Sequence, residues 1–317
     1  MITIKNISDL NNITFENYHL TVLDNLITAT NHREDSTTTI IINEKNRLKT
    51  IRTLEKLLST KIELATFKEK EILSFIENEG FSKTIFTPVG NAASEFNMIV
   101  EGDRIAIGFS GGKDSFTLLN TLVRIKKISN VNFEIFPILI HPEYDLANTK
   151  EISAYCEKLG LQLQIEQTTL SNFLFDKDKN SNIKNPCFLC GRIRRGLLYS
   201  IMKKQNLNKL ALGHHKDDII ETFLMNSFFQ GNLHMMKPNY SSKEHNVTII
   251  RPLALIEESN IIRYVKKLNL PLLKSLCPYE TSEDSKRLKV KNLIKNLSQE
   301  NNDIRSVIFN SIFPLLK

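Results

Sequence analysis

The feature that most constrains the fold is a glycine-rich turn between an apolar run and an amphipathic run. Residues 105–109 read Ile-Ala-Ile-Gly-Phe, residues 110–115 read Ser-Gly-Gly-Lys-Asp-Ser, and helical spacing follows from Phe116 to Ile125. Adjacent glycines let the backbone approach an anion closely. The free N–H groups and the dipole of the following helix attract negative charge. The sequence therefore predicts a phosphate-binding loop between a buried strand and a helix.

The six residues of this loop suit a nucleotide phosphate chain. The two serines donate hydroxyl hydrogen bonds, the lysine neutralises charge, and the aspartate holds Mg²⁺ directly or through water. The spacing is shorter than the G-x-x-x-x-G-K-[ST] phosphate loop. The predicted cofactor-binding residues here are Ser110, Gly111, Gly112, Lys113, Asp114 and Ser115.

Strands and helices are predicted to alternate after this loop. The strands are 104–109, 133–140, 161–167, 209–213 and 247–251, and the helices are 116–125, 151–159, 191–205, 217–229 and 259–268. This alternation predicts an α/β fold: a parallel twisted sheet with helices on both faces. Ligands of such sheets bind beyond the carboxyl ends of the strands.

Three parts are expected along the chain: an N-terminal mixed or helical appendage (1–80), the main domain (81–300) and a C-terminal helical tail (301–317). In the appendage, residues 46–80 have helical spacing with Gly80 as the stop, and Thr37–Ile42 is typical of a strand. The appendage holds ten Lys/Arg and twelve Asp/Glu, and the remainder holds 32 and 23. The basic remainder favours a polyanion such as RNA, although a solvated surface explains it equally well.

Three of the four cysteines suit one metal centre. Cys187 and Cys190 form a Cys-x-x-Cys pair, and Cys277 follows near the end of the predicted core. Three thiolates hold three irons of a four-iron cluster and leave the fourth iron open. Structural zinc usually takes four ligands, and a nearby histidine could supply the fourth, so zinc stays open as the alternative. Cys156 lies in an amphipathic run and is predicted to be a core residue.

Two further polar groups follow predicted elements. Arg192, Arg194 and Arg195 come directly after the cysteine pair and are predicted to bind RNA phosphates, ordinary surface arginines being the alternative. The strand 209–213 ends in Gly-His-His-Lys-Asp-Asp, a cluster that suits phosphate or Mg²⁺. Its predicted cofactor-binding residues are Gly213, His214, Asp217 and Asp218, with His214 or His215 as the extra zinc ligand in that alternative.

Together these stretches resemble the tRNA 2-thiocytidine synthetase branch of the PP-loop ATP pyrophosphatase superfamily. The resemblance covers residues 85–300 and includes the phosphate loop, Cys187-x-x-Cys190, Arg194-Arg195-Gly196, Gly213-His214-His215-x-Asp217-Asp218, Arg251-Pro252-Leu253 and Cys277. Two positions depart from the branch: Glu280 stands where many members have another cysteine, and His141-Pro142-Glu143 replaces an expected Asp-Gln-like loop. The second departure concerns a loop near ATP or the base, and therefore the choice of substrate.

The resemblance implies an ATP-dependent tRNA sulfurtransferase with Mg²⁺ on Asp114 and a [4Fe–4S] cluster on Cys187, Cys190 and Cys277. The usual target is cytidine 32 of the anticodon loop. Its C2 oxygen attacks the α-phosphate of ATP and pyrophosphate leaves; sulfide on the open iron then displaces AMP. The implied catalytic residues are Asp114, Lys113, Cys187 and Cys190. The chemistry needs a sulfur donor such as a cysteine desulfurase, and a homodimer stays open.

Two other interpretations remain open. A PP-loop adenylating enzyme or sulfur transferase could act on a small metabolite or another tRNA base; the three cysteines and the basic body argue against the metabolite. A non-catalytic Fe–S or zinc RNA-binding protein would not need the intact phosphate loop. No apolar run approaches the roughly 20 residues of a membrane span, and the first residues lack a signal-peptide pattern. A cytoplasmic protein without a membrane partner is therefore expected.

Overall fold

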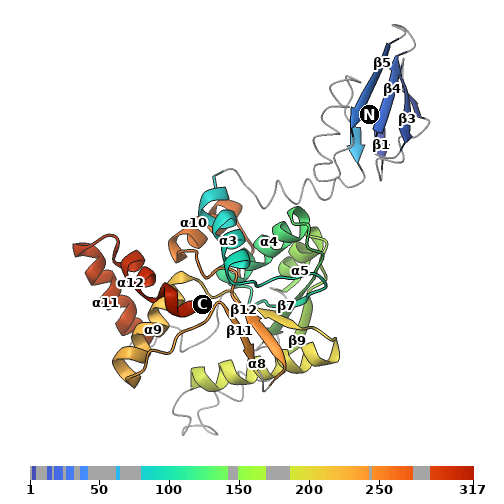
Figure 1. Ribbon diagram of the computed structural model, residues 1–317. Helices are drawn as coiled ribbons and strands as arrows, with labels where there is room; N and C mark the ends of the chain where they lie inside the picture. The colour runs from blue at the N-terminus through green and yellow to red at the C-terminus, as the bar shows by residue number, and fades with distance from the viewer. Residues whose placement is uncertain are drawn as a thin grey trace. The chain divides into compact units, whose positions relative to one another are not determined.

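The computed structural model describes residues 2–4, 13–15, 18–23, 26–31, 36–41, 62–64, 80–141, 149–168, 186–242, 245–273 and 286–317. The chain divides into two compact units, Met1–Ser74 and Phe75–Lys317, and each is described by itself (Figure 1). None of the described helices combines the length and the apolar character needed to cross a membrane.

The N-terminal unit is built from strands. Its antiparallel sheet has the order β2 (Ile13–Phe15), β3 (Tyr18–Leu23), β4 (Leu26–Asn31) and β5 (Ser36–Ile41), and β1 (Ile2–Ile4) pairs in parallel with β6 (Ile62–Leu64). The strand predicted near residue 37 is confirmed. The helical prediction over 46–80 is wrong at 62–64 and otherwise lies outside the described residues, apart from Gly80, which lies in a turn. Local periodicity cannot reveal a strand whose partner lies at the start of the chain.

The second unit contains a six-stranded sheet with the order β11-β12-β10-β7-β8-β9. All neighbours are parallel except β11 and β12, so the predicted α/β fold with a parallel sheet is confirmed. The sequence did not predict the antiparallel edge strand β11. The strands are β7 (Arg104–Gly108), β8 (Glu134–His141), β9 (Gln164–Gln167), β10 (Lys209–Ala211), β11 (Asn239–Ser242) and β12 (Val247–Ile250).

Helices cover both faces of this sheet, with α3, α4, α5 and α10 on one side and α8 on the other (Figure 1). The last described segment, residues 286–317, is also mostly helical. The helical elements are η3 (Ser82–Phe86), α3 (Thr87–Glu95), α4 (Lys113–Ile128), α5 (Thr149–Lys158), α8 (Pro186–Lys204), α9 (Lys216–Gln230), α10 (Glu258–Leu268), α11 (Lys286–Glu300), α12 (Ile304–Ile312) and η4 (Phe313–Leu316).

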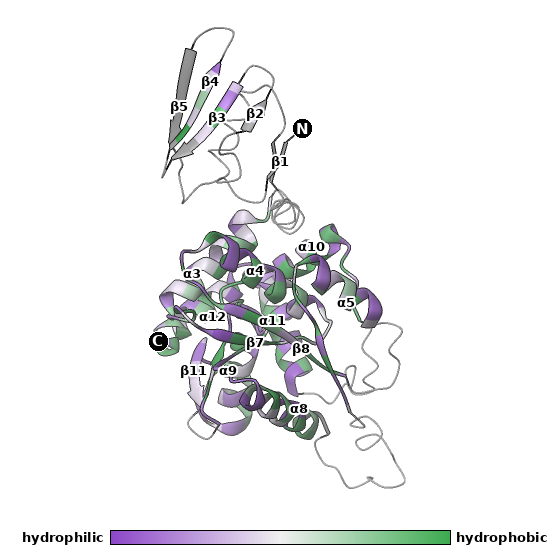
Figure 2. Ribbon diagram, turned by 90° about the vertical axis from the view of Figure 1, so that its right-hand side faces the viewer, coloured by the Kyte–Doolittle hydropathy of each residue, from purple (hydrophilic) through white to green (hydrophobic). Residues whose placement is uncertain are grey.

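Helix α8 packs on the sheet through one apolar stripe. Leu198 and Met202 are buried against Ala106 of β7, Ile138 of β8 and Leu210 of β10. The helix carries both hydrophobic and hydrophilic residues along its length (Figure 2), as expected for a helix with one face on a core. Burial of each large side chain contributes about 1.5–3 kcal/mol, so the core fixes which face of α8 remains outside.

A buried polar network joins the helices on the opposite face. The Asn120 amide of α4 donates to the Tyr264 hydroxyl of α10 at 3.1 Å, and the Tyr155 hydroxyl of α5 donates to the Asn120 amide oxygen at 2.8 Å. A buried amide needs such partners, because an unsatisfied one is costly. Cys156 is fully buried beside this network, and burial raises the pKa of its thiol to about 12, which confirms the predicted core role.

Candidate active site

The predicted motifs meet at one edge of the sheet. Strand β10 pairs in parallel with both β7 and β12, so the carboxyl ends of these three strands are neighbours. The phosphate loop follows β7, the Gly-His-His-Lys-Asp-Asp cluster follows β10, and Arg251 follows β12. After β7 the chain adds β8 and β9 on one side of it, and then places β10 and β12 on the other side. The boundary between β7 and β10 is therefore the topological switch point, where such sheets bind ligands.

Two glycines allow close approaches at this switch point. A Cβ on Gly213 would lie 3.1 Å from the carbonyl carbon and 3.2 Å from the oxygen of Asp114, so a larger residue here would push the backbone of the loop away from the end of β10. Gly111 has φ +75°, and a Cβ there would lie 2.6 Å from Leu273. The Leu273 N–H donates to the Gly111 carbonyl at 2.9 Å, which attaches the segment after α10 to the phosphate loop.

The phosphate loop presents an open helix N-terminus. Gly112 is the N-cap of α4 and no side chain caps it, so its first N–H groups remain available to an anion. Ser110 is exposed, and its hydroxyl accepts from the Gly112 N–H at 3.3 Å. Ser115 is buried and donates to the Gly112 carbonyl at 2.8 Å. Ser110 is therefore accessible to a phosphate, whereas Ser115 shapes the loop.

Asp114 has one oxygen without a partner. Its Oδ2 accepts from Lys113 Nζ at 3.0 Å, while its Oδ1 is buried and unpaired, with His215 Nε2 at 3.8 Å. A buried, unpaired carboxylate oxygen is unfavourable, and a cation would relieve it. Among the described residues no three His, Cys, Asp or Glu side chains converge as a metal site. Mg²⁺ commonly takes only one or two carboxylates together with phosphate oxygens, so this oxygen fits it.

Lys113 is held in place by two carboxylates. Besides Asp114 it contacts Glu258, whose Oε1 lies 3.1 Å from its Nζ. Burial pushes the Lys113 pKa down, but Asp114 and Glu258 outweigh this and raise it, so the ammonium stays charged. Lys291 of α11 contacts the second oxygen of Glu258 at 2.9 Å. The loop lysine is thus connected to the C-terminal helices through one glutamate.

Asp217 lies beside this cluster, but both of its oxygens are used within the protein. Its side chain is nearly buried; Oδ2 accepts from the Glu258 N–H at 2.8 Å and Oδ1 from Arg305 Nε at 3.0 Å. It therefore caps the N-terminus of α10 and binds α12. The structure thus gives Asp217 a scaffolding position, whereas the sequence predicts cofactor contact.

Asp218 is also paired within the protein. Its Oδ2 accepts from the His215 N–H at 2.9 Å, which caps α9, and its Oδ1 pairs with Arg287 of α11. Arg287 also donates to Glu221 at 2.7 Å. Two carboxylates on successive turns of α9 thus share one guanidinium, which joins α11 to the candidate site.

His214 is neutral in this setting. Burial first, and then the positive charge of Arg251, lower its pKa to about 4. Arg251 Nε donates to His214 Nδ1 at 3.2 Å, which requires an unprotonated Nδ1. A neutral ring with its proton on Nε2 can therefore donate one hydrogen bond toward a ligand.

The predicted metal and RNA residues are described only in part. Cys190 is partly exposed near the start of α8, whereas the Cys187 side chain and all of Cys277 lie outside the described residues, so their convergence stays a prediction. Arg192 and Arg195 are exposed. Arg194 points the other way and donates to the Ile140 carbonyl at the end of β8, at 3.4 Å. The three arginines therefore do not form one surface.

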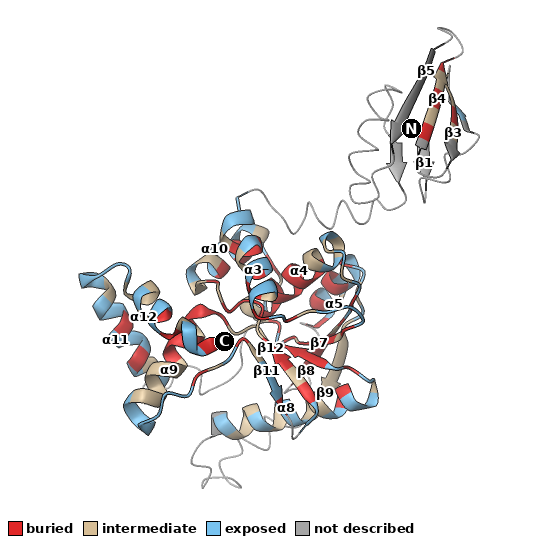
Figure 3. Cartoon of the chain, viewed as in Figure 1, coloured by how far each residue is buried: buried red, intermediate tan, exposed pale blue. Residues whose placement is uncertain are grey.

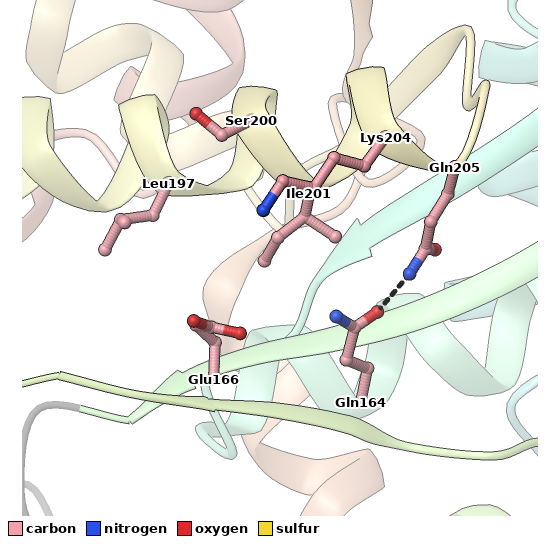
Figure 4. A pocket seen from close by; sticks show the side chains of 7 residues that line it. All are labelled: Gln164, Glu166, Leu197, Ser200, Ile201, Lys204 and Gln205. Atoms are coloured by element: carbon pink, nitrogen blue, oxygen red, sulfur yellow. Dashed lines mark hydrogen bonds between the residues drawn. The ribbon is translucent and has the colours of Figure 1, made fainter.

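A separate cavity of about 150 Å³ lies between α8 and β9 (Figure 4). Its wall includes Glu166 and Lys204, and the Gln205 amide donates to Gln164 at 2.8 Å. None of its lining residues belongs to the motifs at the switch point. This cavity therefore does not contribute to the candidate site.

Sequence reasoning missed the residues that hold the site from a distance. They are Glu258, Leu273, Arg287, Lys291 and Arg305, which lie after Arg251 and outside the recognised motifs. An acidic first-turn residue and scattered basic residues are ordinary in helices. No local signal distinguishes them, because their partners lie on other elements.

Comparison with known proteins agrees with this geometry. The family model described as a PP-loop domain matches residues 84–276. The U34-tRNA thiolase NcsA of Methanococcus maripaludis, solved with its [4Fe–4S] cluster, has a similar fold: the TM-score is 0.57 and the identity 23%, over 73% of this chain and 78% of that one. Fold and loop thus define a PP-loop domain protein, with the Met1–Ser74 unit outside the match.

More similar relatives specify the family. The tRNA-cytidine(32) 2-sulfurtransferase of Pelobacter propionicus is 38% identical over 224 residues, 71% of this chain and 82% of the relative. The protein of the same name from Geotalea uraniireducens is 37% identical over 240 residues, 76% of this chain and 94% of the relative. The chain belongs to the tRNA-cytidine(32) 2-sulfurtransferase family, and the predicted family of tRNA-thiolating enzymes is confirmed.

Proposed function

We propose that this protein uses ATP to activate a tRNA cytidine and replaces its C2 oxygen with sulfur, position 32 being the target named for its relatives. The observation that carries the proposal is the phosphate loop at the switch point, with the unpaired Asp114 oxygen beside an uncapped helix N-terminus. That arrangement suits a cation and a phosphate chain together. Family membership supports the tRNA substrate.

The loop residues would bind and orient ATP. The N–H groups at the start of α4 and the Ser110 hydroxyl donate to phosphate oxygens, and Lys113 exchanges its contact with Asp114 or Glu258 for a phosphate. The neutral His214 can donate from Nε2. Mg²⁺, held by Asp114, would supply charge neutralisation on the departing pyrophosphate. Fixed donors and charges favour the transition state because they need no reorganisation.

Cys187, Cys190 and Cys277 would hold the cluster. A [4Fe–4S] cluster bound by three thiolates supplies an open iron that can carry sulfide. Cys190 is partly exposed at the start of α8, and Leu273, four residues before Cys277, is hydrogen-bonded to the phosphate loop. The donor set of three thiolates suits iron–sulfur, with zinc as the alternative. A sulfur donor such as a cysteine desulfurase and a cytoplasmic location belong to the same proposal.

The test is pyrophosphate release by the full-length holoprotein with ATP, Mg²⁺ and tRNA. Changing Asp114→Ala should reduce the rate at least about 100-fold, because the loop loses its cation ligand, while the melting temperature stays close to wild type. Glu134→Gln is the control, since Glu134 is an exposed carboxylate on the far end of β8 paired with Arg104. Release at the wild-type rate by Asp114→Ala would contradict the proposal, as would release that does not depend on tRNA.

A further inference from the structure

One face of α8 carries two cationic side chains with an aromatic side chain on either side of them. Phe188, Arg192, Arg195 and Tyr199 follow each other at spacings of four, three and four residues, so they lie along one stripe of the helix. Phe188 is 66% exposed, Arg192 and Arg195 are exposed, and Tyr199 is partly exposed. In Figure 3 most of α8 is exposed or intermediate, whereas the strands on which it packs are buried.

The arginines of this stripe differ from Arg194, although all three are close in sequence. Arg194 is committed to the Ile140 carbonyl. No acidic side chain among the described residues pairs with Arg192 or Arg195. Two guanidinium groups one turn apart, without an acidic partner in the described part of the chain, can each bind a phosphate.

The amino-terminal half of the stripe lies at the edge of the sheet that carries the candidate active site. Arg194, between the two arginines of the stripe, donates to the Ile140 carbonyl at the carboxyl end of β8. Tyr199 lies farther along α8, where its ring stacks on His245, just before β12 begins, with centroids 4.4 Å apart. The stripe therefore runs from the cysteine pair at the site edge toward the amino end of β12.

An exposed phenylalanine alone would need no explanation, since single exposed apolar residues are common. Phe188 differs because it lies between the cysteines of the motif and one turn from Arg192. Unpaired RNA bases stack on exposed aromatic rings, and arginines bind the neighbouring phosphates. Phe188 and Arg195 are about 10 Å apart along the helix axis, so a short single-stranded segment can contact both.

We propose that Phe188 stacks on an unpaired base of the tRNA anticodon loop while Arg192 and Arg195 bind its adjoining phosphates. This inference rests on the proposed function and specifies how the substrate reaches the site. The occupant is single-stranded RNA rather than an acidic protein surface, because the aromatic face and the two cations together match a base and its phosphates. By stacking on a base next to the target cytidine, Phe188 would hold that cytidine out of the base stack of the anticodon loop, close to Cys187 and Cys190.

The experiment measures binding of an anticodon stem-loop RNA with cytidine at position 32 to the anaerobic holoprotein at two salt concentrations. Base–aromatic stacking predicts that Phe188→Leu weakens binding about 5- to 150-fold with an unchanged salt slope. Phe188→Tyr should retain wild-type affinity, because it keeps the ring. Phe228→Leu is the control, since Phe228 is 56% exposed but lies on α9.

Two results would overturn the inference. One is equal RNA affinity for Phe188→Leu and the Phe228→Leu control; the other is a decrease in affinity that matches a decrease in the iron content of the Phe188→Leu protein. Wild-type protein that binds the RNA and releases pyrophosphate with tRNA keeps the proposed function intact in both cases. If the wild-type protein neither binds the RNA nor releases pyrophosphate with tRNA, both the proposed function and this inference are contradicted.

Discussion

The basic residues of α8 and those of the C-terminal helices α11 and α12 differ in what they contact. Arg287 and Arg305 pair with carboxylates of α9 that are only 7–17% exposed. Arg192 and Arg195 are exposed and have no acidic partner among the described residues. The same residue type thus stabilises the site in one region and presents positive charge to solvent in the other.

The difference shows why net charge alone could not locate the proposed RNA surface. A cation beside a buried carboxylate is neutralised locally and adds little to a distant field, whereas a cation at the surface without such a partner attracts phosphates. The C-terminal helices therefore act on the site through Asp217, Asp218 and Glu258. Removing cations should affect stability in one region and RNA affinity in the other.

The largest effect on stability is expected from Arg287→Ala. It leaves Glu221 and Asp218, which are 7% and 17% exposed, without their shared guanidinium. Breaking a buried ion pair costs about 3–5 kcal/mol, and the partial exposure of Arg287 reduces this to about 2–3 kcal/mol. Urea unfolding of wild type, Arg287→Ala and Arg287→Lys would measure this loss in the free energy of unfolding. Arg287→Lys should recover part of the lost stability, because it keeps the positive charge. A change below about 0.5 kcal/mol would show that α11 is not held by this pair.

A smaller effect is expected from acid acting on Glu258. Burial pushes its pKa up, but the hydrogen bond and charge of Lys291 and the charge of Lys113 outweigh this and lower the pKa to about 2. Because the folded pKa lies below the unfolded value of 4.5, the stabilisation is present above that value and is lost as the pH falls toward 2. Allowing for solvent screening, we expect about 1–2 kcal/mol.

The measurement is the stability difference between wild type and Glu258→Gln over this pH range. Other carboxylates titrate in both proteins and largely cancel in the difference. The difference should shrink as Glu258 becomes protonated. A difference that stays constant from pH 6 to pH 2 would show that Glu258 gains nothing from Lys113 and Lys291.

The smallest effect on stability is expected from changing both Arg192 and Arg195 to Ala. Substitutions of exposed residues away from buried networks usually stay within about 0.5 kcal/mol. The same double variant should bind tRNA more weakly, and the slope of log affinity against log salt should fall by about 0.7–0.9 for each phosphate that is no longer neutralised. Arg194→Ala is the matched variant, because it removes the hydrogen bond to Ile140 instead. An unchanged salt slope in the double variant would contradict the proposed RNA surface.

Much of the fold followed from local patterns. Apolar runs such as 105–109 and 133–140, separated by amphipathic stretches, predict parallel strands and covering helices, and β7 and β8 confirm them. The strands β1 to β4 of the N-terminal unit, β6 and β11 escaped prediction. The last two are short, and each depends on a partner: β1 for β6 and β12 for β11. Pairing energy from another segment has no local sequence signal.

The sequence by itself determined the chemistry of the phosphate loop, because Ser110–Ser115 lie side by side and their spacing to the strand and helix is set by covalent geometry. It also determined that the motifs after β7, β10 and β12 share one edge, since parallel strands end together.

Only the tertiary structure decided what the charged residues do. Asp217 caps α10 and Arg194 binds the end of β8, although both read as ligand-binding residues in sequence. Glu258 and Arg287 joined the site without any motif. A charged side chain takes its role from the partners and burial that packing gives it, and those partners come from helices far apart along the chain.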